Sequence, residues 1–229
     1  MDHTARLDWQ ITTSNELALA HEEKNMPSTS EPLDSGIRDG RDGWVEPKEG
    51  HQVNRTISDS SRRVVDQETF RSIMGAFPAG VAIVTTADAQ GQRFGLTTTA
   101  VSSVSADPPL LLICVAHTSR TLPVLQRTRR FIVHFMDDDA VGTSSLFASK
   151  SSDKFDSVAW RSSATGMPLL TEGTLAWAEC ETESESVVGD HVVIFARLVD
   201  GAGPSEERSR RPLVYFNRRF GNWVPAGMQ

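Results

Sequence analysis

Short apolar and β-branched runs, separated by turn residues rather than by helices, most constrain the fold of this 229-residue chain. A doubly wound parallel sheet needs a helix after nearly every strand, and only three short stretches here have helical character. We therefore predict a mainly β domain, an antiparallel barrel or sandwich with a few short flanking helices. The predicted strands span residues 81–86, 95–105, 110–116, 131–136, 175–181, 191–199, 213–216 and 220–224.

The first predicted helix has Asp66 as its N-cap and one apolar face, formed by Phe70, Ile73, Met74 and Phe77. Two further helices are expected over residues 119–127, starting at Ser119, and over residues 140–149. The run 110–116 is apolar throughout, so we expect a central strand covered on both faces. Residues 151–173 are expected to form a loop, and the acidic stretch before Gly189 a connection.

Residues 1–64 differ in composition from the rest of the chain. All ten Phe residues and the single Tyr follow position 64, whereas the stretches 30–36 and 38–43 are polar and rich in glycine or charge. Such a segment buries too little apolar surface to offset the entropy lost on ordering. We predict a disordered leader over residues 1–64 and one folded domain over residues 65–229.

Charge and composition exclude several classes of function. A formal net charge of −7 and a pI near 5.4 provide no basic surface for nucleic acid. The chain has neither an apolar run of about 18 residues nor a signal-peptide pattern, so we predict no membrane association. Cys114 and Cys180 lie in separate strand-like runs and match no zinc or redox spacing, which favours free thiols and a cytoplasmic location.

An almost uncharged stretch over residues 95–109 carries five hydroxyl side chains between Thr97 and Ser103. Short hydroxyl side chains beside an accessible backbone suit a surface that lies along a polar ligand. A threonine-rich edge strand facing water explains the stretch equally well when it is taken alone. Its neighbours therefore decide between the two readings.

Three residues that follow the apolar run 110–116 indicate an anion site. Ser119, Arg120 and Thr121 place two hydroxyls and a guanidinium at the expected start of a helix, where backbone N–H groups are free. An ordinary capped helix is the alternative. Together with the hydroxyl-rich strand, however, these residues supply a phosphate end and a flat polar floor, which a flavin requires.

A histidine and a lysine are further candidates. Gly189 permits a tight turn, Asp190 can orient an imidazole, and His191 begins an apolar strand, where it can donate to a pyridine nucleotide or a reduced flavin. A strand-start histidine with only a structural role is the alternative. Lys154 beside Phe155 either contacts an adenine or phosphate or is simply solvated.

Other site types are not supported. The glycines form neither a dinucleotide fingerprint nor a P-loop, and no metal-binding cluster of Cys and His is present, so we predict no metal. Ser102 and Ser103 lack the elbow motif of a hydrolase nucleophile. His134 lies in the middle of an apolar strand and is expected to be structural.

The ordered set of these motifs resembles the flavin reductase-like family, the small NAD(P)H:flavin oxidoreductase components of two-component flavin-dependent monooxygenases. The resemblance spans about residues 66–223. It is carried by the stretches 70–86, 95–110, 119–121, 147–148, 154–155, 166–168, 189–191 and 212–216.

This resemblance implies a six-stranded antiparallel Greek-key barrel, the FMN-binding split barrel, in a homodimer with a flavin site at each subunit interface. It implies FAD or FMN as the flavin, NADH or NADPH as hydride donor from nicotinamide C4 to flavin N5, and a partner monooxygenase that receives the reduced flavin. Two alternatives stay open: a flavoprotein that keeps its flavin and acts on a small organic molecule, and a non-catalytic flavin-binding protein.

The resemblance also implies roles for individual residues. His191 would be the catalytic residue near the nicotinamide. The flavin would contact Thr97, Thr98, Thr99, Ala100, Val101, Ser102 and Ser103 along its ring and ribityl chain, and Cys114, Val115, Ala116, Ser119, Arg120 and Thr121 near its phosphate. Lys154, Phe155, Gly189 and Asp190 complete the expected binding residues.

Overall fold

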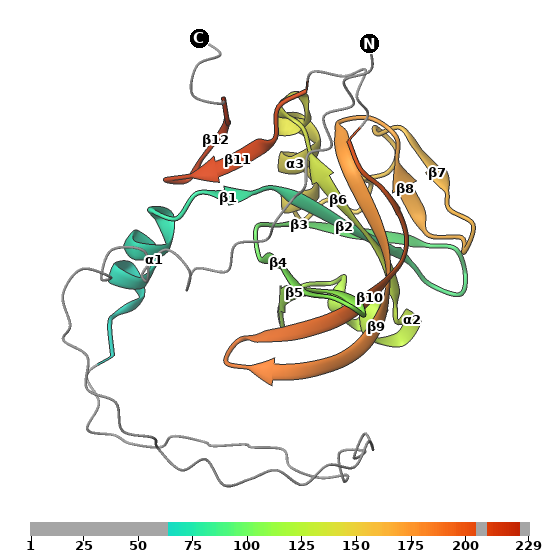
Figure 1. Cartoon of the computed structure of the whole chain (residues 1–229), viewed down its shortest axis with the longest axis horizontal. Coiled ribbons are helices and arrows are strands. Elements are labelled where there is room, and N and C mark those ends of the chain that lie inside the picture. The colour runs from blue at the N-terminus through green and yellow to red at the C-terminus, as the bar shows by residue number, and fades with distance from the viewer. Residues whose placement is uncertain (1–63, 205–209, 225–229) are drawn as a thin grey trace, which may run out of the picture. The chain divides into compact units, whose positions relative to one another are not determined.

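The computed structural model describes residues 64–204 and 210–224, so the predicted leader lies outside the described residues except for Val64. The helices are α1 (Gln67–Gly75), α2 (Leu122–Thr128), the 3₁₀ helix η1 (Asp138–Ala140) and α3 (Val141–Ala148). The strands are β1 (Ala79–Gly80), β2 (Ala82–Ala87), β3 (Arg93–Thr98), β4 (Val101–Ala106), β5 (Pro109–Ala116), β6 (Arg130–Met136), β7 (Trp160–Ser162), β8 (Pro168–Leu170), β9 (Thr174–Val188), β10 (His191–Ala202), β11 (Leu213–Phe216) and β12 (Arg219–Asn222) (Figure 1).

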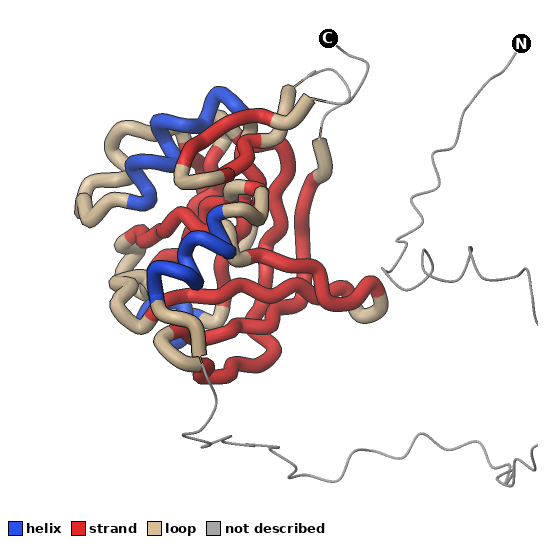
Figure 2. Tube along the Cα trace, turned by 90° about the vertical axis from the view of Figure 1, so that its left-hand side faces the viewer, coloured by secondary structure: helices blue, strands red, loops and turns tan. Residues whose placement is uncertain are grey.

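One antiparallel sheet of seven strands, in the order β3-β2-β6-β9-β10-β5-β4, forms the body of the domain. Its two edge strands, β3 and β4, follow each other directly in the chain, so the sheet curls until its edges meet at one connection. These seven strands consequently form a single curled layer, with the helices at its periphery, while β1-β11-β12 and β7-β8 form two small separate sheets (Figure 2). The predicted mainly β, antiparallel split barrel is confirmed, although the sheet has seven strands rather than six.

The prediction of one continuous strand over residues 95–105 is wrong. The chain leaves the sheet after Thr98, whose Oγ1 accepts a hydrogen bond from the Ala100 N–H at 3.0 Å. A side-chain bond of this kind competes with the strand ladder and favours a turn. β3 therefore pairs with β2, while β4 pairs with β5 at the other edge of the sheet. Counting β3 and β4 as one bent strand would restore six.

The main core lies inside the curled sheet and contains Val84, Ile113, Phe131, Val133 and Ile194, all completely buried. Their burial follows from the period-2 alternation of side chains along each strand.

β5 shows this alternation clearly, because Leu111 and Val115 are buried whereas Leu112 and Cys114 are partly exposed. The expectation that 110–116 is covered on both faces is therefore wrong, because the side chains on its outer face stay partly exposed within the described chain. Cys114 and Cys180 are free thiols, as predicted.

A second apolar cluster holds α3 and the segment after it against β2. Phe147 and Phe155 meet edge to face with ring centroids 5.2 Å apart, and Phe155 meets Trp160 in the same way at 6.2 Å. Such aromatic pairs add stability beyond the area that they bury.

Residues 151–173 are not a simple loop, because Trp160–Ser162 and Pro168–Leu170 form the hairpin β7–β8. Gly166 adopts a φ of +87° in the connection between them, a conformation that favours glycine.

His134 fastens this hairpin to the sheet. Its Nε2 accepts the Leu170 N–H at 3.0 Å, and its Nδ1 lies 3.0 Å from the Ile83 carbonyl oxygen, to which it donates. Both ring nitrogens are thereby satisfied in a completely buried position. Burial lowers the pKa of His134 to about 4 and is only partly opposed by the bond to Ile83. The predicted structural role of His134 is confirmed.

α1 begins as predicted, with the Asp66 carboxylate accepting the Thr69 N–H at 2.7 Å. The helix buries none of its side chains, however. Its apolar face, Phe70, Ile73 and Met74, is 48–58% exposed, and Phe77 beyond its end is 65% exposed.

None of the described helices is long and apolar enough to cross a membrane.

The hairpin β9–β10 is longer than predicted. The acidic stretch 182–188, expected to be a connection, continues β9 and pairs with β10, with one register shift between Thr182 and Ser184, and the chain reverses at Gly189 and Asp190. Gly189 has a φ of +60°, as a tight turn requires. The hairpin extends past the end of β6, whose pairing with β9 starts at Glu181. The turn therefore projects from the barrel (Figure 1).

Candidate active site

Two hollows flank the connection between β3 and β4. The first, here called the β3–α2 hollow, has a volume of about 490 Å³ and lies between β3, the turn before α2 and the segment after α3. It brings together seven of the predicted site residues: Thr97, Ala116, Ser119, Arg120, Thr121, Lys154 and Phe155. Of the hydroxyl-rich run 97–103, Thr97 alone shares this hollow with the Ser119 turn.

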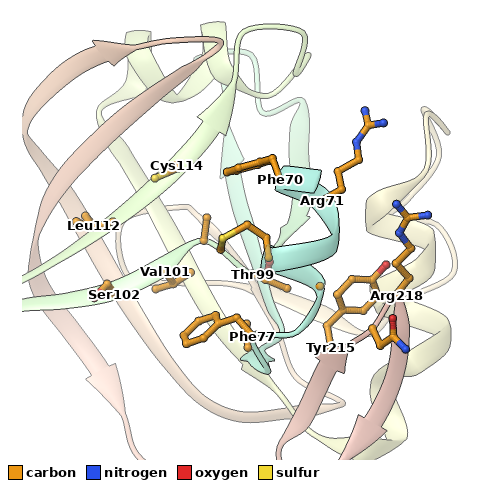
Figure 3. Close-up of a pocket in the computed structure, with 15 residues that line it drawn as sticks. Phe70, Arg71, Phe77, Thr99, Val101, Ser102, Leu112, Cys114, Tyr215 and Arg218 are labelled. Carbon is orange, nitrogen blue, oxygen red and sulfur yellow. The ribbon is translucent and has the colours of Figure 1, made fainter. Parts of the chain in front are cut away.

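The second hollow, here called the α1–β4 hollow, has a volume of about 750 Å³ and contains five other predicted residues: Thr99, Ala100, Val101, Ser102 and Cys114. Phe70 and Phe77 extend from the α1 segment toward β4 and β5, whereas the side chains of Arg71 and Arg218 extend the other way (Figure 3). This hollow is mainly apolar and opens to the surface of the described chain.

The run 97–103 thus serves both hollows, with Thr97 in the first and residues from Thr99 onward in the second. Thr98 and Ser103 line neither one, and the Thr97 hydroxyl already donates to the Ser144 carbonyl at 2.6 Å. Val115 also lines neither, because its side chain is buried in the core.

The turn before α2 differs from the predicted helix start. α2 begins at Leu122, Thr121 makes no capping bond with its side chain, and Ser119 Oγ accepts the Thr121 N–H at 3.3 Å. Arg120 donates from Nη2 to the carbonyl oxygens of Lys150 and Ser151, which ties this turn to the segment after α3. An anion bound at this turn would therefore be held by side chains rather than by a helix N-terminus.

Lys154 is neither solvated nor free to reach far into the hollow. Its Nζ donates to the Phe147 oxygen at 2.7 Å and to the Gly95 oxygen at 3.1 Å, so it joins α3 to β3. Burial lowers the pKa of Lys154, and the nearby charge of Arg120 lowers it further. Phe155 is buried behind this lysine and forms part of the wall.

The Gly189–His191 turn presents an oriented imidazole. Asp190 Oδ1 lies 2.7 Å from His191 Nδ1, and this hydrogen bond lowers the pKa of Asp190 more than any other contact. With Nδ1–H donated to the carboxylate, Nε2 is the ring nitrogen left for a ligand. His191 pairs across the sheet with Ala116, which lines the β3–α2 hollow. The predicted catalytic residue therefore lies beside that hollow, although none of residues 189–191 lines it.

Sequence reasoning missed two basic residues of the β3–α2 hollow, Arg93 and Lys150. With Arg120 and Lys154 they give the hollow four cationic side chains, and no Asp or Glu lines it. Within the described residues, the buried Nε of Arg93 has no hydrogen-bond partner. The sequence contained a signal, because Arg93 lies two residues before the almost uncharged stretch 95–109. This donor set fits the anionic phosphate end of a flavin.

A metal centre has no comparable support. Among the residues that the structure describes, no group of three His, Cys, Asp or Glu side chains is placed to hold a metal ion.

Residues 74–224 match the flavin reductase like domain, which is about two thirds of the chain. The chain belongs to this family. It is an NAD(P)H:flavin oxidoreductase, and the predicted resemblance is confirmed.

Individual relatives agree with this assignment. The chain is 40% identical over 161 residues to a flavin reductase (NADH) from Kitasatospora aureofaciens, covering 70% of this chain and 83% of the relative. It is 35% identical over 156 residues to HsaB, the reductase subunit of a flavin-dependent monooxygenase from Rhodococcus jostii, covering 68% and 77%. A solved structure of an NADH:FAD oxidoreductase from Streptomyces globisporus, in complex with NAD and FAD fragments, has a TM-score of 0.65 at 28% identity, covering 72% of this chain and 99% of that one.

Proposed function

We propose that this protein uses NADH or NADPH to reduce free FAD or FMN and passes the reduced flavin to a partner flavin-dependent monooxygenase. The observation that carries the proposal is the β3–α2 hollow, in which Thr97 and the Ser119 turn share a cationic cavity beside His191. When bound, the flavin supplies the redox chemistry by accepting a hydride at N5 from C4 of the nicotinamide. The protein supplies binding, alignment and charge.

The residues of the two hollows bind different parts of the flavin. Ser119, Thr121 and Arg120 hold the phosphate end, because a hydroxyl and a guanidinium there face a cavity without carboxylates. Exposed backbone and side chains from Thr99 to Ser102 provide a polar edge for the ribityl chain and ring. Cys114 and Ala116, on the outer face of β5, lie between these two regions of the site.

His191 orients the nicotinamide and the flavin, between which the hydride is transferred. Asp190 fixes the imidazole with its Nδ1–H toward the carboxylate, so Nε2 is the ring nitrogen left to face a ligand. From its position beside the hollow, this ring nitrogen orients the nicotinamide against the flavin during hydride transfer. Proton transfer by a strong acid or base is not required for hydride transfer itself, which agrees with the exposed position of this single histidine.

The proposal includes a homodimer. The apolar face of α1 is 48–58% exposed, and the outer face of β5 leaves Leu112 and Cys114 partly exposed beside it. Exposed apolar surface of this extent indicates a protein interface. A second copy of the chain that packs on these two surfaces would close the α1–β4 hollow and complete a flavin site at the subunit boundary. The free thiols Cys114 and Cys180 favour a location in the reducing cytoplasm.

An anaerobic mixing experiment tests the proposed reaction. Purified protein is mixed with NADH or NADPH and a large molar excess of FAD or FMN, and flavin absorbance is followed. Bleaching of many flavin equivalents per protein is the expected result. Bleaching of bound flavin alone, and only with an organic substrate, would contradict the proposal in favour of a self-contained flavoenzyme. Bound flavin that never bleaches would indicate a binding protein.

A further inference from the structure

Arg93 is held in an unusual way at the wall of the β3–α2 hollow. Its guanidinium carbon lies 4.3 Å from the ring centroid of Trp160 and 5.8 Å from that of Phe155. Stacking on aromatic faces fixes the plane of a guanidinium and leaves its N–H edge free. Its Nε is buried without a hydrogen-bond partner, and Arg93 forms no ion pair within the described residues. A buried donor left unpaired is costly, so a ligand that accepts from it is favoured.

The other cationic side chains of the hollow also lack a carboxylate partner within the described residues. Arg120 donates only to backbone carbonyls, and so does Lys154, so neither cation has a carboxylate partner in the described residues. Lys150 adds a fourth, exposed cation. In a chain with a net charge of −7, this is a local excess of positive charge. Polyanions are attracted to such a concave, single-sign surface.

The arginines come from separate walls, Arg93 from the start of β3 and Arg120 from the turn before α2. A single phosphate monoester at the Ser119 turn engages Arg120 and leaves the Arg93 donor on the other wall unexplained. A volume of about 490 Å³ is in the range that encloses a whole organic group rather than one phosphate.

We infer that the β3–α2 hollow is a diphosphate site, in which Arg93 binds the ADP half of a dinucleotide. Two substrates of the proposed function carry that group, FAD and the pyridine nucleotide, and the inference therefore rests on that function. FMN lacks the ADP group. Arg93 acts as a specificity residue for the dinucleotide, and Trp160 positions its guanidinium.

The test is a set of binding titrations, which need no turnover. ADP, AMP, FMN, FAD and NADH are titrated separately into wild-type protein and into Arg93→Met, Arg93→Lys and Arg161→Met. Arg161 is an exposed arginine on β7 beside Trp160 that does not line the hollow, so its variant is matched in charge.

Wild-type protein should bind ADP more tightly than AMP. Arg93→Met should weaken ADP binding about ten- to a hundredfold, as expected for a lost charge-assisted pair. The ADP affinity of Arg93→Lys should lie between those of wild type and Arg93→Met. The ADP affinity of Arg161→Met should match that of wild type.

The remaining ligands identify the source of the ADP group. If FAD supplies it, Arg93→Met loses affinity for FAD and keeps its affinity for FMN. If the pyridine nucleotide supplies it, NADH affinity falls and both flavin affinities are unchanged. An equal loss for FAD and FMN, or no loss for any ligand, would overturn the inference.

Should Arg93→Met fail to fold, wild-type protein still decides the matter, because failure to bind ADP or equal affinity for ADP and AMP overturns the site. Bleaching of excess flavin at saturating substrate reports on the proposed function separately.

Discussion

His191 Nδ1 and Asp190 Oδ1 lie 2.7 Å apart at the tip of the β9–β10 hairpin, and the Asp190 carbonyl also accepts the His117 N–H at 3.0 Å. The carboxylate thus orients the imidazole, while the backbone holds the turn against the end of β5. His191 pairs across the sheet with Ala116, which lines the β3–α2 hollow.

Replacement of His191 with Ala should slow flavin reduction about tenfold or more while flavin affinity is retained, because the side chain acts on the reacting pair rather than on the phosphate. Anaerobic stopped-flow absorbance gives the rate, and fluorescence titration gives the affinity. His117→Ala, which removes an exposed neighbouring imidazole, is the control. An unchanged rate in His191→Ala would remove this residue from the site.

Replacement of Ile73 with Glu should convert a dimer into monomers, because a charge would be buried in the proposed α1 interface. Sedimentation velocity should show wild type at about twice the chain mass of 25.1 kDa and the variant at about 25.1 kDa. Ser72→Glu places the same charge on the neighbouring position of α1, which lies outside the apolar face of the helix, and should stay dimeric. Wild type that sediments as a monomer would refute the homodimer.

Acid should destabilise the protein through His134. The pKa of this buried imidazole is about 4 in the folded state against an ordinary value of 6.5, so between these pH values only the unfolded state binds the proton. Stability is fully present above pH 6.5, falls by about 1.4 kcal/mol per pH unit below it, and levels off below pH 4 after a loss of about 3 kcal/mol.

Urea unfolding at several pH values measures this slope. His134→Gln keeps a donor and an acceptor but does not titrate, so its stability should be lower at neutral pH and less dependent on pH. Identical pH slopes for wild type and variant would show that His134 is not the group responsible.

Lys154→Met should destabilise the fold by roughly 2 kcal/mol, because the carbonyls of Gly95 and Phe147 lose a charged donor while the alkyl packing is kept. A lower urea midpoint at constant m reports this loss. The exposed Lys150, replaced in the same way, should change stability by no more than about 0.5 kcal/mol. Equal midpoints for the two variants would assign Lys154 a role in binding alone.

The sequence predicted most elements because their apolar and β-branched residues follow strand or helix spacing. It failed where a single tertiary contact decides local structure. The Thr98 side chain breaks the predicted long strand at Ala100. His134 holds Leu170 in β8, where the short apolar run 167–170 has no alternating strand pattern of its own.

Similar reasons limited the prediction of the site. Lys154 and Phe155 both line the β3–α2 hollow, but composition cannot reveal that Lys154 Nζ is committed to two carbonyls. Arg93 was missed because its stacking on Trp160 joins positions far apart in the chain. Val115 alternates inward with its neighbours, which the uniformly apolar run 110–116 concealed.

A crystal structure of the protein with bound FAD tests the central claim most directly. We predict that the flavin phosphate lies against Ser119 and Arg120 in the β3–α2 hollow, with the ring and ribityl chain along residues 97–103 and the open ring face toward His191. Flavin bound elsewhere, with the hollow between Thr97 and Ser119 empty, would contradict the account.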